Sequence, residues 1–166
     1  MKKTIYPLLL LVFGLIVSCS QNQNTEKNVQ LIDNYVKAVE SLDQEAMSSI
    51  LDDNYMGYGP SYGDSINKTN AIANWKYNVE HLYESIKYSK SRSMAVTVPD
   101  GENEGDWVSN WAELNIKFKE DLGEVNIWAN SVYKIENGKI VRSFTFYNEA
   151  DALEQLGYVF LYNDNF

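Results

Sequence analysis

The sequence is poor in the residues that build disulfides and metal sites. Among its 166 residues there is one cysteine, Cys19, and one histidine, His81. A single cysteine excludes an intramolecular disulfide. A single histidine without further cysteines leaves no recognisable cluster of metal ligands. There is also no glycine-rich phosphate loop and no Walker pattern. The sequence therefore predicts no metal and no cofactor.

Basic residues are scarce as well. The chain carries 14 Lys and Arg against 23 Asp and Glu, which gives a net charge of −9. A surface of this sign is repelled by nucleic acid and by anionic lipid headgroups. Because no basic run interrupts it, we expect no nucleic-acid partner.

The sequence also lacks an apolar run long enough to cross a bilayer, which needs about 20 residues. Residues 5–17 are almost wholly apolar and follow Lys2 and Lys3, as in the core of an export signal. Ser18 then places a small side chain directly before Cys19, and the segment Ile16-Val17-Ser18-Cys19 resembles the lipobox of bacterial lipoproteins. The resemblance implies that residues 1–18 are a signal peptide and that Cys19 becomes the acylated N-terminus. The alternative is an incidental cysteine in an ordinary signal peptide that is cleaved elsewhere.

Cleavage before Cys19 would leave 148 residues with 12 basic and 23 acidic side chains, a net charge of −11. We therefore expect acyl chains on Cys19, and not surface charge, to hold the protein on a membrane outside the cytoplasm; more than one chain makes such anchoring stable. Ser20 is not a retention signal of the aspartate type, which favours the outer membrane. Residues 19–27 would form a flexible tether, and residues 28–166 a single domain.

Hydrophobic periodicity predicts helices before strands. Apolar residues recur every three or four positions from Val29 to Leu42. A second, short helix follows Asp43 as its N-cap, and a third follows Asn67 or Thr69 with Ile86 at the end of its apolar stripe. A short strand lies between them and ends near Gly59-Pro60. Alternating patterns then predict strands at 88–98, 106–118, 124–136 and 139–147, with an Asn137-Gly138 hairpin turn. A last helix opens at Asn148 or Glu149 and is capped by Gly157. The order predicts an α+β fold.

Aromatic residues gather on the predicted strands and suggest a cavity. On the strand 106–118, one face carries Trp107 and Trp111, and the other carries Val108, Ala112 and Leu114. Both faces are thus partly apolar, and both mix large rings with small polar groups. Rings accompanied by a few amides are the usual lining of a small-molecule site. The simpler alternative is that the rings fill a core or a dimer interface.

The passages "ILDDNYMGYGP", "WVSNWAELNIKF", "VYKIENGKIVRSFTFYN" and "ADALEQLG" are similar to the nuclear-transport-factor-2-like superfamily, and within it to the SnoaL-like branch. The resemblance covers residues 28–157. It implies a cone-shaped fold in which a strongly curved antiparallel sheet wraps over the N-terminal helices. It also implies that a homodimer can form through the outer face of the sheet. This fold carries isomerases, cyclases, hydrolases and binding proteins, so the site must decide the function.

The residues at the family's catalytic positions point away from proton chemistry. Relatives that abstract protons place a carboxylate before a proline at the end of the first strand or directly before the last helix. Those positions hold Gly59 and Asn148 here, and a histidine common on the third strand is replaced by Asn130, three residues before Tyr133. Two weaker proton carriers remain, Glu113 and His81, and each has a more ordinary explanation as a surface residue.

We therefore predict that the domain binds a small, partly apolar molecule without catalysis. Ring contacts and amide hydrogen bonds in the mouth of the cone would come from Tyr58, Trp75, Trp111, Trp128, Asn130, Tyr133, Tyr147 and Asn148. Two alternatives stay open. One is an isomerase or hydrolase that uses Glu113 or His81. The other is a protein-interaction module whose cavity is filled by its own side chains.

Overall fold

The computed structural model describes residues 24–161, so the predicted signal segment and Cys19 lie outside the described residues. An N-terminal helix over residues 24–40 opens the fold. The other elements are, in chain order, α2 (Gln44–Ile50), β1 (Leu51–Tyr58), β2 (Ser65–Asn67), α3 (Lys68–His81), β3 (Tyr83–Val98), β4 (Gly105–Phe118), β5 (Glu124–Glu136), β6 (Lys139–Tyr147) and α4 (Glu149–Gln155).

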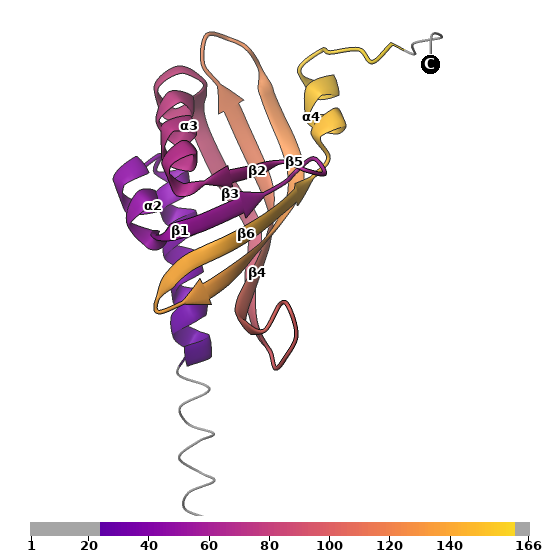
Figure 1. The fold of residues 1–166 in the computed structure, drawn as a ribbon. Helices are drawn as coiled ribbons and strands as arrows, with labels where there is room; N and C mark the ends of the chain where they lie inside the picture. The colour runs from indigo at the N-terminus through magenta and orange to yellow at the C-terminus, as the bar shows by residue number, and fades with distance from the viewer. Residues whose placement is uncertain (1–23, 162–166) are drawn as a thin grey trace, which may run out of the picture.

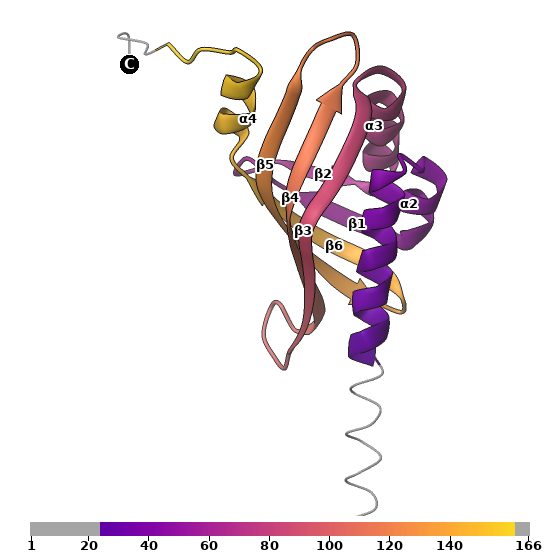
Figure 2. The same ribbon diagram turned by 180° about the vertical axis from the view of Figure 1, so that it is seen from behind.

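The six strands form one curved, unclosed sheet in the order β2-β1-β6-β5-β4-β3. The N-terminal helix, α2 and α3 lie together against one face of this sheet, and α4 lies beside β5 at one end (Figures 1 and 2). The predicted α+β class and the curved sheet over helices are confirmed. The sheet is mixed, however, because β1 pairs with β6 in parallel while the other pairings are antiparallel.

Local side-chain hydrogen bonds fix where the elements begin. Oδ1 of Asp43 accepts from the backbone N of Ala46 at 2.9 Å and caps α2. Oδ1 of Asn67 accepts from the backbone N of Asn70 at 3.0 Å and caps α3. Asn137 and Gly138 both take positive φ angles of 52° and 73°, as a two-residue hairpin turn requires. The predicted caps and the hairpin are thus confirmed.

The core lies between the helices and the inner face of the sheet. Ile32 of the N-terminal helix, Ile140 of β6 and Val108 of β4 are fully buried and belong to one core cluster. Another cluster, which contains Leu114, is covered by Ala152 of α4 and by Leu156, the residue that follows α4. The inner face of the sheet is therefore covered by the N-terminal helix over one cluster and by α4 over another.

Two predicted boundaries were wrong. Residues 24–27, expected in the flexible tether, are helical. The apolar stripe begins only at Val29, but Glu and Lys are good helix formers and extend the helix by a turn without core contacts. The third helix ends at His81, and Ile86 lies in β3.

Large apolar side chains remain exposed on the outer face of the sheet and at the C-terminus. They are Met94, Val96, Trp111, Trp128 and Phe146 on the outer face, and Tyr158, Val159, Phe160 and Leu161 after α4. Within residues 24–161, no helix has both the length and the apolar character needed to span a bilayer.

Candidate binding cavity

A cavity of about 250 Å³ lies between the inner face of the sheet, the helices and α4. We call it the central cavity. Most of its wall is apolar. The lining side chains are Val39, Trp75, Tyr83, Ile86, Tyr88, Asn110, Leu114, Ile116, Phe118, Val125, Ile127, Ala129, Ser131, Thr145, Tyr147 and Ala152. The volume and the apolar wall fit a small organic molecule.

A second cavity, of about 340 Å³, adjoins the first between α2, α3 and β1. Trp75, Thr145 and Tyr147 line both cavities, so these three side chains form the partition between them. The neighbouring space is more polar, with Gln44, Asn74 and Asn78 among its lining residues. A ligand longer than the central cavity could extend past the partition.

Three polar side chains cross the inner face of the sheet in register. Asn110 of β4 pairs with Ser131 of β5, and Ser131 pairs with Thr145 of β6. The hydroxyl groups of Ser131 and Thr145 are 3.1 Å apart and share a hydrogen bond. We call these three residues the polar row. The next positions toward the β4–β5 turn are apolar, beginning with Ala112 and Ala129, so the polar row forms one end of a mostly apolar chamber.

The lining of both cavities is uncharged. Of the side chains that the described residues contribute to these walls, none is Asp, Glu, His, Lys or Arg. The titratable groups there are tyrosines, and burial raises the pKa of Tyr83, Tyr88 and Tyr147. These hydroxyl groups remain neutral hydrogen-bonding groups near neutral pH, where they do not act as bases.

The backbone leaves no room for a carboxylate at Gly59. This glycine has a φ of 94°, and a Cβ added to it would collide with the backbone oxygen of Thr145. Only glycine fits such a close approach with positive φ. The absence of a side chain at position 59 is therefore required by the path of the backbone.

Trp75 and Tyr147, both predicted to contact a ligand, lie in the wall of the cavities. The ring of Trp75 packs against that of Tyr83 with centroids 5.8 Å apart. Tyr133 is buried just beyond the polar row, opposite Val108 and Ser143, and its ring meets Tyr35 edge-on at 5.7 Å. The Tyr133 ring thus packs behind the polar row, at the end of the central cavity.

Asn148 and Asn130 occupy other places than the predicted cavity mouth. Oδ1 of Asn148 accepts from the backbone N of Asp151 at 3.2 Å and caps α4. Asn130 lies opposite Trp111, on the other face from Ser131, and its Nδ2 donates to Oγ of Ser109 at 2.9 Å. These amides orient parts of the protein itself.

Trp111 and Trp128 also lie away from the predicted position, on the outer face of the sheet. Trp111 is 40% exposed and Trp128 is 62% exposed. Lys90 Nζ lies 5.3 Å from the centroid of the Trp128 ring. Tyr58 stacks on Phe144 at 5.0 Å and lines an outer groove with the Gly59-Pro60 loop. The physical reason is that the helices pack on the face that carries Val108, Ala112 and Leu114, so the alternation of the strands leaves Trp111 and Trp128 on the other face.

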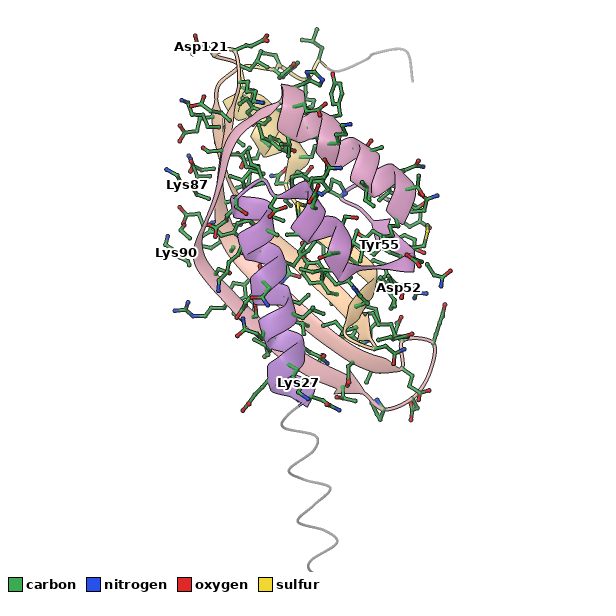
Figure 3. The ribbon with its side chains drawn as sticks, turned by 90° about the vertical axis from the view of Figure 1, so that its left-hand side faces the viewer. Lys27, Asp52, Tyr55, Lys87, Lys90 and Asp121 are labelled. Atoms are coloured by element: carbon green, nitrogen blue, oxygen red, sulfur yellow. The ribbon has the colours of Figure 1, made fainter. Side chains whose placement is uncertain are left out.

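Glu113 and His81 lie outside both cavities. Glu113 is on the outer face and pairs with Lys90 at 2.5 Å. His81 is the last residue of α3; its side chain is 59% exposed and lies 3.8 Å from Glu80. In Figure 3, Lys90, the partner of Glu113, lies on the opposite side of the molecule from Tyr55, which lines the second cavity. Neither candidate proton carrier can therefore reach a molecule in the cavities.

The residues that sequence reasoning missed are those of the polar row. Asn110 is the amide in a run whose inner-facing positions, Val108, Ala112 and Leu114, are otherwise apolar. A polar residue in the middle of an apolar face is a usable signal, because burying an amide is unfavourable unless something pairs with it.

The sequence matches no protein-family model and no curated protein. Its fold does match solved structures. A candidate polyketide cyclase from Xanthomonas campestris superposes with a TM-score of 0.65 at 14% identity, over 80% of this chain and 98% of the other. A candidate SnoaL-like polyketide cyclase from Shewanella denitrificans gives 0.60 at 14%, over 77% and 95%.

An epoxide hydrolase of the LEH-like kind from Mycobacterium tuberculosis gives a TM-score of 0.61 at 13% identity, over 80% of this chain and 91% of the other. All three likenesses span most of both chains at low identity, so they establish the fold and leave the chemistry open. The chain therefore has the nuclear-transport-factor-2-like fold, in the form found in SnoaL-like proteins.

Proposed function

We propose that the chain is a lipid-anchored, extracytoplasmic binding protein whose domain holds a small, neutral, partly apolar molecule in the central cavity without converting it. The observation that carries this proposal is the wall of the central cavity, which is mostly apolar, together with the lack of charged side chains in the walls of both cavities among the described residues. A charged ligand would lose its hydration there without gaining a counter-ion.

The same wall argues against acid–base catalysis. A general acid or base works best with a pKa near the pH at which the enzyme operates. The cavities offer tyrosines whose pKa values are raised, with Gly59 where a carboxylate would otherwise stand. Glu113 and His81, the residues on which an isomerase or hydrolase would depend, face away from the cavities.

The hollow interior also separates binding from the third alternative, a module whose cavity is filled by its own side chains. A filled cone would leave no space between Trp75, Leu114 and Tyr147, whereas these residues border about 250 Å³. Such a volume lined by apolar groups favours an occupant.

The anchoring part of the proposal rests on the sequence. Lys2 and Lys3, the apolar run 5–17 and the Ser18-Cys19 pair form the export and acylation signal. Metabolic labelling of expressing cells with a radioactive fatty acid tests it directly. We expect label on the chain and its loss in a Cys19→Ser variant; an unlabelled wild-type chain would contradict the proposal.

Binding is tested with N-phenyl-1-naphthylamine, a neutral apolar dye whose fluorescence rises in apolar surroundings. The chain from residue 19 with Cys19→Ser is suitable, because every described element follows residue 23. We expect saturable binding of one dye per chain. An Ala129→Phe variant, which fills the wall of the central cavity, should abolish binding.

The matched control is Trp128→Phe on the adjacent residue of β5, whose side chain points to the outer face. It should leave dye binding unchanged. Thermal unfolding of both variants shows whether they are folded, since overpacking a core costs about 1–3 kcal/mol. Equal dye binding by folded Ala129→Phe and by the wild type would refute the cavity as the site.

A further inference from the structure

The amide of Asn110 is held in one orientation by residues of the neighbouring strand β3. Its Nδ2 lies 3.0 Å from Oγ of Ser91, 3.1 Å from Oγ of Ser93 and 3.4 Å from the backbone oxygen of Arg92. The hydroxyl groups could serve either end of the amide, but a backbone carbonyl only accepts. The Arg92 carbonyl therefore places the nitrogen on the β3 side and the oxygen on the other side.

The oxygen of this amide faces the central cavity. Asn110 is only 4% exposed, and it is one of the residues that line the central cavity. Within residues 24–161 its Oδ1 has no hydrogen-bond donor, while no fully enclosed side-chain N or O atom of these residues lacks a partner. Both facts are satisfied together only if Oδ1 borders the open space. Oδ1 of Asn110 is therefore a fixed hydrogen-bond acceptor with an open position.

The other two members of the polar row are hydrogen-bonded to each other. Ser131 and Thr145 share a hydrogen bond with each other at 3.1 Å, and Tyr133 adds a side-chain hydrogen bond to Ser131. Asn110 Oδ1 is thus the acceptor of the row that has no partner among the described residues. Beyond it the wall runs through the apolar side chains Leu114 and Ile116 to Phe118, and its other polar groups belong to Tyr83, Tyr88 and Tyr147.

We propose that Asn110 is the specificity-determining residue of the cavity, and that it selects neutral molecules that carry a hydroxyl or N–H group on an apolar body. This inference rests on the proposed binding function and names the class of ligand. The donor of the ligand bonds Oδ1 of Asn110, and the apolar body lies along the wall toward Phe118. Molecules that present only an ether or carbonyl oxygen at that end place an acceptor against an acceptor and are disfavoured.

The test compares three probes of nearly equal shape by calorimetric titration at pH 7: 2-naphthol, 2-methoxynaphthalene and naphthalene. The chain is the same Cys19→Ser chain from residue 19. We expect 2-naphthol to bind about fivefold more tightly than either of the other two, the size of one net hydrogen bond. An Asn110→Leu variant should bind the three probes equally.

The control is Asn130→Leu, the same change at an amide whose Nδ2 bonds Ser109 on the outer side of the sheet. It should keep the preference for 2-naphthol. Because Asn110 also ties β3 to β4, its variant can fail to fold; the ranking of the three probes on the unaltered chain then still decides.

The outcomes distinguish a failure of the proposed binding function from a failure of the role proposed for Asn110. If none of the three probes binds, and the dye does not bind either, the proposed binding function fails and this inference with it. If the probes bind with equal affinity, the cavity is a binding site but Asn110 does not select its ligand. A preference for 2-naphthol that survives in folded Asn110→Leu also overturns the inference, because the donor is then accepted elsewhere.

Discussion

Buried tyrosines make the interior resistant to ionisation. Burial and the neighbouring ring of Tyr55 raise the pKa of Tyr133 to about 12, although a hydrogen bond with Ser131 lowers it in part. Burial is also the first cause of the raised pKa of Tyr35 and of Tyr88, and the tyrosines raise one another's pKa further. The folded state therefore favours the protonated hydroxyl more strongly than the unfolded chain does, because the pKa of a tyrosine in the unfolded chain is near 10.

This difference predicts a loss of stability at alkaline pH. Below pH 10 these tyrosines are protonated in both states and their contribution to stability is fully present. Between pH 10 and about 12 the unfolded chain releases their protons and the folded chain keeps them, so the free energy of unfolding falls with rising pH. For Tyr133 alone the loss by pH 12 is roughly 2–3 kcal/mol. Urea unfolding at pH 9, 10, 11 and 12 measures it.

A Tyr133→Phe variant serves as the control for the alkaline series. It has no proton to release, so its stability should fall less steeply above pH 10 than that of the wild type. Tyrosinate absorbance should rise in step with unfolding and not before it. Identical pH dependence in both chains would show that Tyr133 ionises as freely in the folded state as in water.

At the scale of the residue, the sequence predicted the types of residue at the cavity better than the face of the sheet on which each side chain lies. Trp75 and Tyr147 were expected at the cavity and line it. The alternation of the strands correctly places Trp111 and Trp128 on one face of the sheet, but it does not show which face becomes concave. That choice depends on how the helices pack, and it placed Asn110 inside and both tryptophans outside.

At the scale of the element, α4 is the weakest wall of the central cavity. It is seven residues long, has no fully buried residue and is held by its cap and by Gln155, which bonds both the backbone N and the backbone O of Asn126. An isolated helix of this length is not stable in water. Its order therefore depends on these bonds and on the packing of Ala152 and Leu156 against the core.

We expect Asn148→Ala to loosen α4 and to speed the release of the dye from the cavity, because α4 contributes Ala152 to the wall. Loss of such a cap costs about 1 kcal/mol. Hydrogen exchange of the amides of residues 149–156 should rise several-fold, and stopped-flow dilution should give a faster dissociation rate. Asn148→Asp keeps an acceptor at the cap and should behave as the wild type. Unchanged exchange in Asn148→Ala would contradict the capping role.

Elements with local signals were predicted well, and those with distant causes were not. The bounds of β5 and β6 agree with the alternation of the sequence and the Asn137-Gly138 turn. The end of α3 has a distant cause: Nζ of Lys119 donates to the backbone oxygens of Val79 at 2.7 Å and Glu80 at 2.9 Å. The parallel pairing of β1 with β6 likewise joins segments some ninety residues apart, which periodicity does not reveal.

At the scale of the whole molecule, the outer face of the sheet is too apolar for a surface that meets only water. Trp111, Trp128 and Phe146 are exposed there beside Met94 and Val96, each at 40% or more. Large apolar side chains exposed together on one face are a feature of interaction sites. We propose that two copies of the chain associate through this face.

Sedimentation velocity of the Cys19→Ser chain tests the association. We expect a dimer whose dissociation constant rises at least tenfold in a Trp128→Lys variant, since a charge would be buried at the contact. Tyr77→Ser, which removes a ring that is 57% exposed on α3, is the matched control and should leave the dimer intact. A wild-type chain that sediments as a monomer at high concentration would rule out the pairing.

The start of the first described helix and the β4–β5 turn, which borders the central cavity, lie at opposite ends of the molecule. Lys27 lies at one end and Asp121, in the turn between β4 and β5, at the other, and Phe118 and Val125 of the cavity wall flank that turn (Figure 3). Four residues lie between Cys19 and residue 24, so the five steps along the chain span at most about 18 Å. An acylated Cys19 would hold the Lys27 end close to the lipid. Cargo would then enter and leave from the aqueous side, and the domain would sample what diffuses past the envelope surface instead of extracting molecules from the bilayer beneath it.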